Sequence, residues 1–280
     1  MGTAVTELGF FPTLANPAPT PVRSQLTLSL FPGADLFGRG FEEEGFCVVR
    51  GPDFITGGDV RAFHAPAGRF DGVFGGPPCP DFSRARRGPP SPYGEAMVRE
   101  FLRVVAETAP RWFLMENVPG VPSVVLHGYT VQRLDLDASQ FGLRQRRLRH
   151  FQFGSVSGLV LCLPRGSAGD CPGCDPTCLA SDPGGHSWPE FCALQGLPPG
   201  FDLPGMTREA KFRAVGNGVP VPMARALARA VLAAAPSHAV SLCVCGCGRT
   251  VTHRGRYALP RCRKAAQRRR DGSGQRTLHA

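Results

Sequence analysis

The sequence Phe70-Asp-Gly-Val-Phe-Gly-Gly-Pro-Pro-Cys79 joins a short apolar run to a loop of glycine and proline. Residues 70–74 are typical of a buried β-strand, and the Gly-Gly-Pro-Pro that follows restricts the backbone of the loop. A loop at the carboxyl end of a strand is where an open α/β sheet places its ligands. Cys79 is therefore a candidate nucleophile, although a single free cysteine is more commonly a small buried hydrophobic residue.

Apolar runs and helical patterns alternate on both sides of this stretch. We expect strands at residues 25–31, 46–49, 70–74, 111–116, 131–135 and 147–153. We expect helices at residues 36–44, 95–108, 188–195, 208–215 and 220–234. Strands that alternate with helices predict an α/β fold with a doubly wound, mostly parallel sheet.

Composition divides the chain into six segments. Residues 1–24 form a proline-rich arm, and residues 25–153 and 187–236 carry the strand and helix pattern. Between them, residues 154–186 are an irregular insert rich in Gly, Pro, Ser, Asp and Cys. Residues 243–270 form a small basic module with four cysteines, and residues 271–280 are expected to be a disordered tail.

The net charge of +10 is concentrated at one end of the chain. Residues 243–280 hold ten Lys and Arg against one Asp, whereas residues 1–242 hold 22 basic against 21 acidic side chains. The tail is therefore the part expected to attract nucleic acid. No apolar run approaches the roughly 20 residues that a membrane-spanning helix needs, so we expect a soluble protein.

The eleven cysteines are expected to be free thiols in a reducing compartment rather than a disulfide scaffold. The chain is long, and its first residues carry no basic region before an apolar stretch, so a reducing, cytoplasmic setting is expected. In that setting, clustered cysteines more often serve metal binding or catalysis than disulfide bonds.

Five motifs in order resemble those of the DNA (cytosine-5)-methyltransferases. The first two are Gly75-Gly-Pro-Pro-Cys79 and Glu116-Asn-Val118, each after an expected strand. The others are Gln145-Arg-Arg-Leu-Arg149, Leu194-Gln-Gly-Leu-Pro198 and Gly216-Asn-Gly-Val-Pro220. The resemblance implies a Rossmann-like methyltransferase fold, S-adenosylmethionine as methyl donor, and double-stranded DNA as substrate.

The resemblance also implies a role for each catalytic residue. Cys79 adds to C6 of a flipped cytosine, because C5 alone is a poor nucleophile toward a sulfonium methyl group. Glu116 hydrogen-bonds or protonates N3, which requires a protonated or shared carboxyl group. Arg147, assisted by Arg149, lies beside the base and the thiolate. The alternative for the glutamate is an ion-paired strand end. For the arginines taken alone, a solvated strand edge is favoured, and it is the combination of motifs that favours the catalytic roles.

The resemblance further assigns a cofactor site. Phe31 and Gly33 fall in the first cofactor motif, and Asp53 follows the second expected strand, where a carboxylate takes the ribose hydroxyls. Asp59 is expected to contact the adenine amine, and Pro80 and Asn217 to complete the pocket. The first motif departs from the family pattern Asp-x-Phe-x-Gly-x-Gly-Gly, with Ser29 in place of its leading carboxylate and Asp35 in place of a glycine.

The insert and the tail raise questions of recognition and metal binding. With about 30 residues where the family places its target-recognition region, we expect a short or degenerate recognition sequence. Cys162, Cys171, Cys174, Cys178 and His186 lie in the insert, where loop cysteines without a metal are favoured over a zinc site. In the tail, the expected zinc ligands are Cys243, Cys245, Cys247 and Cys262. This tail resembles small zinc knuckles that continue into a basic helix, and the alternative is a disordered basic tail.

The activity that these patterns imply is DNA cytosine-5 methylation by a monomeric, cytoplasmic enzyme of bacterial or phage origin, associated with the nucleoid through DNA. Two alternatives stay open. One is a catalytically impaired methyltransferase fold that only binds DNA, and the other is methylation of RNA cytosines. Whether the protein serves restriction–modification, phage protection or a solitary role also stays open.

Overall fold

A computed structural model describes most of the two segments that carry the strand and helix pattern and parts of the tail. The described residues are 25–78, 81–82, 91–163, 185–236, 243–245, 248–249, 251, 255–270 and 277–279. Cys79, Pro80 and Cys247 lie outside them, as do Cys171, Cys174 and Cys178 of the insert.

Six strands form one sheet in the order β2-β1-β3-β4-β7-β6. These are β1 (Leu26–Leu30), β2 (Cys47–Arg50), β3 (Gly72–Gly75), β4 (Trp112–Asn117), β6 (Thr130–Asp137) and β7 (Leu148–Ser155). The first four are parallel to one another, whereas β7 runs antiparallel to both of its neighbours. The expected mostly parallel sheet is confirmed.

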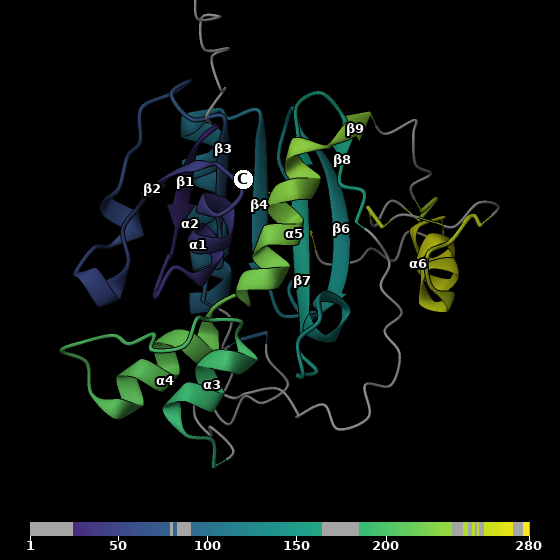
Figure 1. Ribbon diagram of the computed structural model, residues 1–280. Coiled ribbons are helices and arrows are strands. Elements are labelled where there is room, and N and C mark those ends of the chain that lie inside the picture. Colours follow the sequence, from purple (N-terminus) through teal and green to yellow (C-terminus); the bar gives the residue numbers. More distant parts are fainter. Residues whose placement is uncertain are drawn as a thin grey trace, which may run out of the picture.

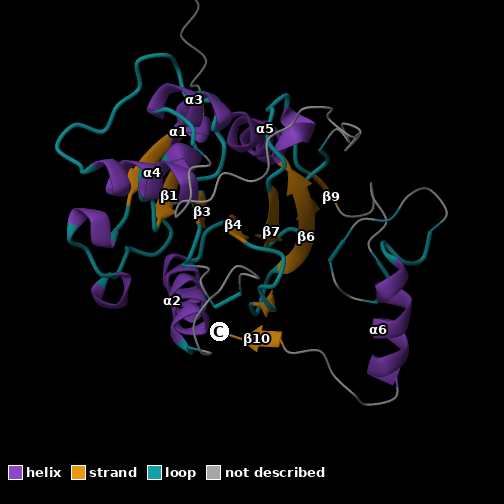
Figure 2. Ribbon diagram, turned by 90° about the horizontal axis from the view of Figure 1, so that it is seen from below, coloured by secondary structure: helices purple, strands orange, loops and turns teal. Residues whose placement is uncertain are grey.

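Helices cover both faces of this sheet, as Figure 2 shows from below. On one face lie α1 (Leu36–Glu42) and α5 (Val221–Leu232), and on the other lies α2 (Tyr93–Thr108). Alternating strand residues supply the two cores: Phe74 and Leu114 face α1 and α5, whereas Val73, Phe113 and Met115 face α2. This period of two is why the strands are continuous apolar runs in the sequence.

Two short helices close the end of the sheet at which β1, β3 and β4 finish. They are α3 (Trp188–Leu194) and α4 (Arg208–Asn217), and they lie below the sheet in Figure 1. Phe191 and Phe212 pack with their ring centroids 4.7 Å apart, and Leu36 at the start of α1 joins the same apolar cluster. The second half of the strand and helix pattern therefore returns to the carboxyl ends of the strands, where a ligand site is expected.

Shorter elements lie outside this core. They are the 3₁₀ turns η1 (Phe54–Thr56), η2 (Val60–Ala62) and η3 (Ala138–Phe141), and strands β5 (Ser123–Val125), β8 (Leu159–Val160), β9 (Ala235–Pro236) and β10 (Thr277–His279). In the tail, α6 spans Pro260–Arg270 and lies beyond the β6 edge of the sheet in both views.

The structure differs from the sequence-based boundaries in two places. Strands β7 and β8 extend into the segment expected to be irregular from residue 154, because β8 pairs with β9 after α5. Residues 277–279, expected to be disordered, pair in parallel with β5. Within the described residues, no helix combines the length and the apolar character needed to cross a bilayer.

Candidate functional site

A cavity of about 560 Å³ opens beyond the carboxyl ends of β1, β3 and β4. Its walls come from the turn after β1, from η1, from the loop after β3 and from one face of α4. Six of the residues expected at the site from the sequence line it, among them Phe31, Gly33, Asp53, Glu116 and Asn217. Arg149 lines it as well, so residues from the whole length of the strand and helix pattern meet in one cavity.

The turn after β1 forms one wall and has an unusual backbone. Phe31, Gly33 and Asp35 all have left-handed conformations, with φ values of 54°, 56° and 49°. A carboxylate oxygen of Asp53 accepts a hydrogen bond from the Gly33 amide at 3.0 Å, and its other oxygen accepts one from Ile55 at 2.8 Å. Asp53 thus joins the turn to η1 across the mouth of the cavity.

The altered positions of this turn contact each other. The Ser29 hydroxyl donates to Asp35 Oδ1 at 3.0 Å, and the same oxygen accepts from the Gly38 amide in the first turn of α1. Arg50 lies 2.7 Å from the other carboxylate oxygen. Asp35 is absent from the cavity lining. Its carboxylate is directed toward residue 29, where the family pattern has its leading carboxylate.

Two expected cofactor residues are placed differently from Asp53. The carboxylate of Asp59 pairs with Arg61 at 2.6 Å and caps η2, and it does not line the cavity, although its neighbours Gly58 and Val60 do. The sequence analysis did not consider Arg61, which forms this ion pair with the Asp59 carboxylate. Pro80 lies outside the described residues.

The end of β3 requires glycine, and the first residue of the following loop is packed closely against Glu116. A Cβ atom at Gly75 would lie 2.2 Å from the Leu30 carbonyl oxygen of β1, and one at Gly76 would lie 2.7 Å from Oε2 of Glu116. The Asn117 side-chain amide donates to the Pro77 carbonyl at 3.0 Å. The described chain therefore passes directly beside Glu116 on its way to Cys79.

Glu116 and Arg149 form the charged part of the cavity. Arg149 Nε lies 3.1 Å from Glu116 Oε1, and both side chains are largely buried. Burial raises the pKa of the Glu116 carboxyl group, and the positive charges of Arg149 and Arg147 oppose that rise. A carboxyl group with a raised pKa next to a fixed cation can exchange a proton and still be held in one position.

Arg147 is placed differently from the sequence-based expectation. It is fully buried, does not line the cavity, and donates to the carbonyl oxygens of Gly216 and Gly218 at 2.6 and 3.0 Å. These carbonyls flank Asn217, which does line the cavity. Arg147 lies just before β7 begins and turns toward these carbonyls, whereas Arg149, within the strand, lines the cavity.

A buried hydrogen-bond network joins the three later motifs. Gln145 donates to the Leu194 carbonyl at 2.5 Å and to the Gln195 side chain at 3.2 Å. Gln195 in turn donates to the Val215 carbonyl at 2.9 Å. Polar groups buried at this depth need partners, so the glutamines and Arg147 hold the Gly-Asn-Gly turn against β7.

Sequence reasoning missed the α4 wall and the apolar residues of η1. Ala210, Arg213 and Asn217 of α4 line the cavity together, at spacings of three and four, and Met206 lines it from just before the helix. That spacing marks one helical face, and Asn217 was already a candidate, so the signal was present in the sequence. Phe54 lines the cavity while 60% exposed, and its position directly after Asp53 was the available signal.

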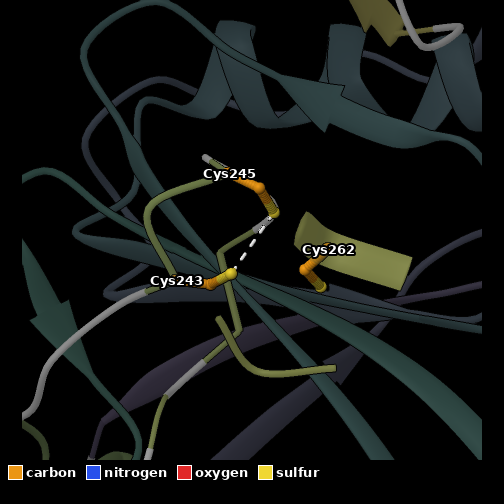
Figure 3. Close-up of side chains that lie close together, drawn as sticks. All are labelled: Cys243, Cys245 and Cys262. Atoms are coloured by element: carbon orange, nitrogen blue, oxygen red, sulfur yellow. Dashed lines mark hydrogen bonds between the residues drawn. The ribbon is translucent and has the colours of Figure 1, made fainter. Parts of the chain in front are cut away.

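The cysteines of the described residues have distinct environments. Burial raises the pKa of the Cys192 thiol to about 11, as expected for a packing residue. Cys162 of the insert is exposed. Cys243, Cys245 and Cys262 of the tail converge with their sulfur atoms within 4.8 Å of one another (Figure 3).

Comparison with known proteins gives a consistent set of similarities. Residues 55–164 match the model of C-5 cytosine-specific DNA methylases. The chain is 26% identical over 189 residues to the type II methyltransferase M.NgoPII of Neisseria gonorrhoeae, covering 55% of each chain. It is 30% identical over 158 residues to the type II methyltransferase M.FnuDI of Fusobacterium nucleatum, covering 45% of this chain and 46% of that protein. The chain spans about half the length of these relatives.

Among solved structures, the methyltransferase EhMeth of Entamoeba histolytica is similar in fold. The TM-score is 0.53 at 11% identity, and the match covers 75% of this chain and 98% of that one. At this identity the similarity concerns the fold alone, which is that of a Rossmann-like methyltransferase.

Proposed function

We propose that this chain transfers a methyl group from S-adenosylmethionine to C5 of cytosine in DNA, on the premise that its residues 55–164 match the model of C-5 cytosine-specific DNA methylases and that type II methyltransferases are among its relatives. The observation that carries the proposal is the pair Glu116 and Arg149 in the cavity, beside the loop that leads to Cys79. The relatives are named type II methyltransferases, so we place the enzyme in a restriction–modification setting.

The cavity has the properties that a nucleoside cofactor requires. Its volume is typical of small-molecule sites, and Leu30, Ile55 and Val60 provide apolar contacts. Asp53 has carboxylate lone pairs left for hydroxyl donors after binding the Gly33 and Ile55 amides. Phe54 offers an exposed ring for the face of a purine. When bound, S-adenosylmethionine supplies the methyl group as a sulfonium electrophile.

The protein's own groups activate the base. The Cys79 thiolate forms a bond to C6 of the cytosine, and the electron pair of the C5–C6 double bond becomes available at C5. Negative charge develops at N3 in this step, and protonated Glu116 donates a proton there. After methylation, a water molecule takes the C5 proton, and the C5–H electron pair re-forms the C5–C6 double bond as the thiolate leaves C6. N3 then returns its proton to the Glu116 carboxylate.

The two arginines take different roles in this proposal. Arg149 lies at Glu116 and stabilises the carboxylate that remains after proton donation, in a site with little water. Arg147 is a positioning residue, because it holds the carbonyls on both sides of Asn217. This division replaces the expectation that Arg147 itself contacts the base.

Access to the cytosine requires base flipping, because C6 and N3 are enclosed in a stacked duplex. With so short a recognition region, we expect few base contacts and a short or degenerate target. We further propose that the protein acts as a monomer in the cytoplasm, where its free thiols stay reduced.

The test is transfer of a labelled methyl group from S-adenosylmethionine to mixed-sequence DNA by the purified full-length chain. We expect incorporation that disappears in Cys79→Ser and persists in Cys47→Ser, an exposed thiol on β2. Incorporation that persists in Cys79→Ser would reject the covalent mechanism. Cofactor binding without transfer to DNA, but with transfer to RNA, would identify the other substrate class.

A further inference from the structure

Three thiols of the tail are buried although little protein surrounds them. Cys243, Cys245 and Cys262 are only 3%, 4% and 3% exposed. Figure 3 shows Cys243 and Cys245 on one loop and Cys262 on α6, with the three side chains directed toward one another. The apolar residues that pack against them are all only partly buried: Val251, Tyr257, Ala258, Leu259 and Ala266. So small a core does not account for the convergence of three thiols.

The sulfur positions suit a tetrahedral metal ion. Zinc–thiolate bonds of about 2.3 Å place neighbouring sulfur atoms about 3.8 Å apart. Here the Sγ atoms of Cys243 and Cys245 are 3.3 Å apart, and all three sulfurs lie within 4.8 Å of one another. Small shifts therefore suffice to bind an ion between them.

The backbone around the thiols supports charged sulfur. The Ala258 amide donates to Cys243 Sγ at 3.3 Å, an interaction that stabilises a thiolate. The Cys243 amide donates to the Arg249 carbonyl and the Val244 amide to the Arg256 carbonyl, so the loop folds back on itself around Cys243. Four thiolates on Zn²⁺ carry a net charge of −2, which suits a segment as basic as this one.

We propose that Cys243, Cys245 and Cys262 bind a structural zinc ion that holds the basic C-terminal helix against the β6 edge of the sheet. The fourth ligand expected from the sequence is Cys247, which lies outside the described residues. Cys247 is chosen by its spacing of two residues from Cys245. Zinc bound by four thiolates has no open coordination position, so the ion is structural rather than catalytic.

The attachment to the sheet lies directly after the cysteine loop. The Gly248 carbonyl accepts a hydrogen bond from the Arg133 amide of β6 at 2.8 Å. A Cβ atom at Gly248 would lie 2.4 Å from the Val131 carbonyl oxygen, so this approach requires glycine. Arg249 pairs with Asp135 at 3.0 Å, and Asp135 also contacts His150 at 2.5 Å. The cysteine loop therefore covers part of an edge strand whose backbone would otherwise be exposed.

The consequence concerns the position of α6. Cys262 lies in the first turn of α6, so a metal that joins it to Cys243 and Cys245 also joins α6 to β6. Arg261, Arg263 and Lys264 flank Cys262 on this helix. Zinc thus gives these basic side chains a set location beside the sheet, and removing the ion releases them.

Zinc content of the full-length chain, purified under reducing conditions, tests the metal site. We expect one zinc ion per chain, loss of that ion in Cys262→Ser, and retention in Cys162→Ser, the exposed cysteine of the insert. Substitution with Co²⁺ should produce the charge-transfer absorption of thiolate ligands. A chain without zinc, a disulfide among these cysteines, or loss of zinc in Cys162→Ser instead would overturn the proposal.

Hydrogen exchange tests the attachment separately. Chelation of the zinc should speed exchange at the Arg133 amide and leave the amides of β1 unchanged. Gly248→Ala should retain zinc but show the same faster exchange in β6, which separates metal binding from docking. Unchanged exchange at Arg133 after chelation would refute the docking. Neither measurement depends on methyl transfer, so the proposal stands or falls independently of the catalytic function.

Discussion

Exchanging the residues at positions 29 and 35 tests how the altered cofactor turn works. We expect the Asp35 carboxylate to do the work of the leading carboxylate that is missing at Ser29, because Ser29 Oγ lies 3.0 Å from Asp35 Oδ1. Three variants follow: Asp35→Gly, Ser29→Asp, and the double variant, which restores the family pattern at both positions. If the two positions share one carboxylate site, the single changes are harmful and the double change is tolerated.

The magnitudes come from the contacts. Asp35→Gly leaves the buried Ser29 hydroxyl without its acceptor, at about 1–3 kcal/mol, but relieves a left-handed backbone at φ 49°, worth about 1 kcal/mol. The net cost is about 0–2 kcal/mol. Ser29→Asp places two carboxylates in contact, and two charges about 4 Å apart repel by about 4 kcal/mol at an effective dielectric constant of 20. Protonation of one group reduces this to about 3 kcal/mol.

The double variant keeps one carboxylate, beside Arg50 and the start of α1, and should lie within about 1 kcal/mol of the wild type. The double variant is then about 3 kcal/mol more stable than the sum of the two single changes predicts, and this difference is the coupling free energy between the two positions. Urea unfolding gives the free energies, and titration calorimetry with S-adenosylmethionine gives the matching affinities. Additive effects of the two changes would refute the shared carboxylate site.

Three further perturbations address the cavity and the tail. Glu116→Gln should lower kcat about 10²–10³-fold, because an amide cannot donate a full proton. Burial raises the pKa of Glu116, so the wild-type rate should fall as pH rises through that pKa, and this fall should be absent in the variant. Arg147→Lys should cost about 3 kcal/mol of stability and raise KM for the cofactor more than it lowers kcat, because it releases the turn around Asn217. Deleting residues 243–280 should leave transfer measurable but weaken DNA binding and flatten its salt dependence, by about 0.9 in logarithmic slope for each phosphate that the tail neutralises.

A different result would contradict each of these three predictions. An alkaline decline that survives in Glu116→Gln would mean that another group titrates there. If Arg147→Lys lowered kcat without changing KM, the result would indicate that Arg147 contacts the base directly. An unchanged salt slope after deletion of the tail would mean that the catalytic segment supplies the phosphate contacts.

The sequence by itself determined the class of fold and predicted several of the residues that line the cavity. Apolar runs of four to seven residues alternating with helical patterns predict the parallel sheet, because strands covered on both faces must be apolar on both faces. The expected boundaries agree with the observed ones to within about three residues at β1, β4 and α2. Glu116, Arg149, Asp53 and Asn217 were all nominated from motifs and all line one cavity.

Only the tertiary structure decided which partner each of these side chains contacts. Arg147 and Arg149 are two residues apart in one motif, yet one holds the Gly-Asn-Gly turn and the other meets Glu116. Asp53 and Asp59 were both expected at the cofactor site. Asp53 lines the cavity, whereas Asp59 forms an ion pair with Arg61. Motif spacing does not contain this information, because it depends on which partners approach from distant parts of the chain.

The tail shows the same division. Its charge and its cysteines were evident in the sequence, whereas its attachment to β6 through Gly248 and Arg249 was not. A sequence specifies local chemistry, since residue types set what a side chain can bind. Contacts such as Arg249 with Asp135, 114 residues apart, exist only once the sheet has formed and offers an edge.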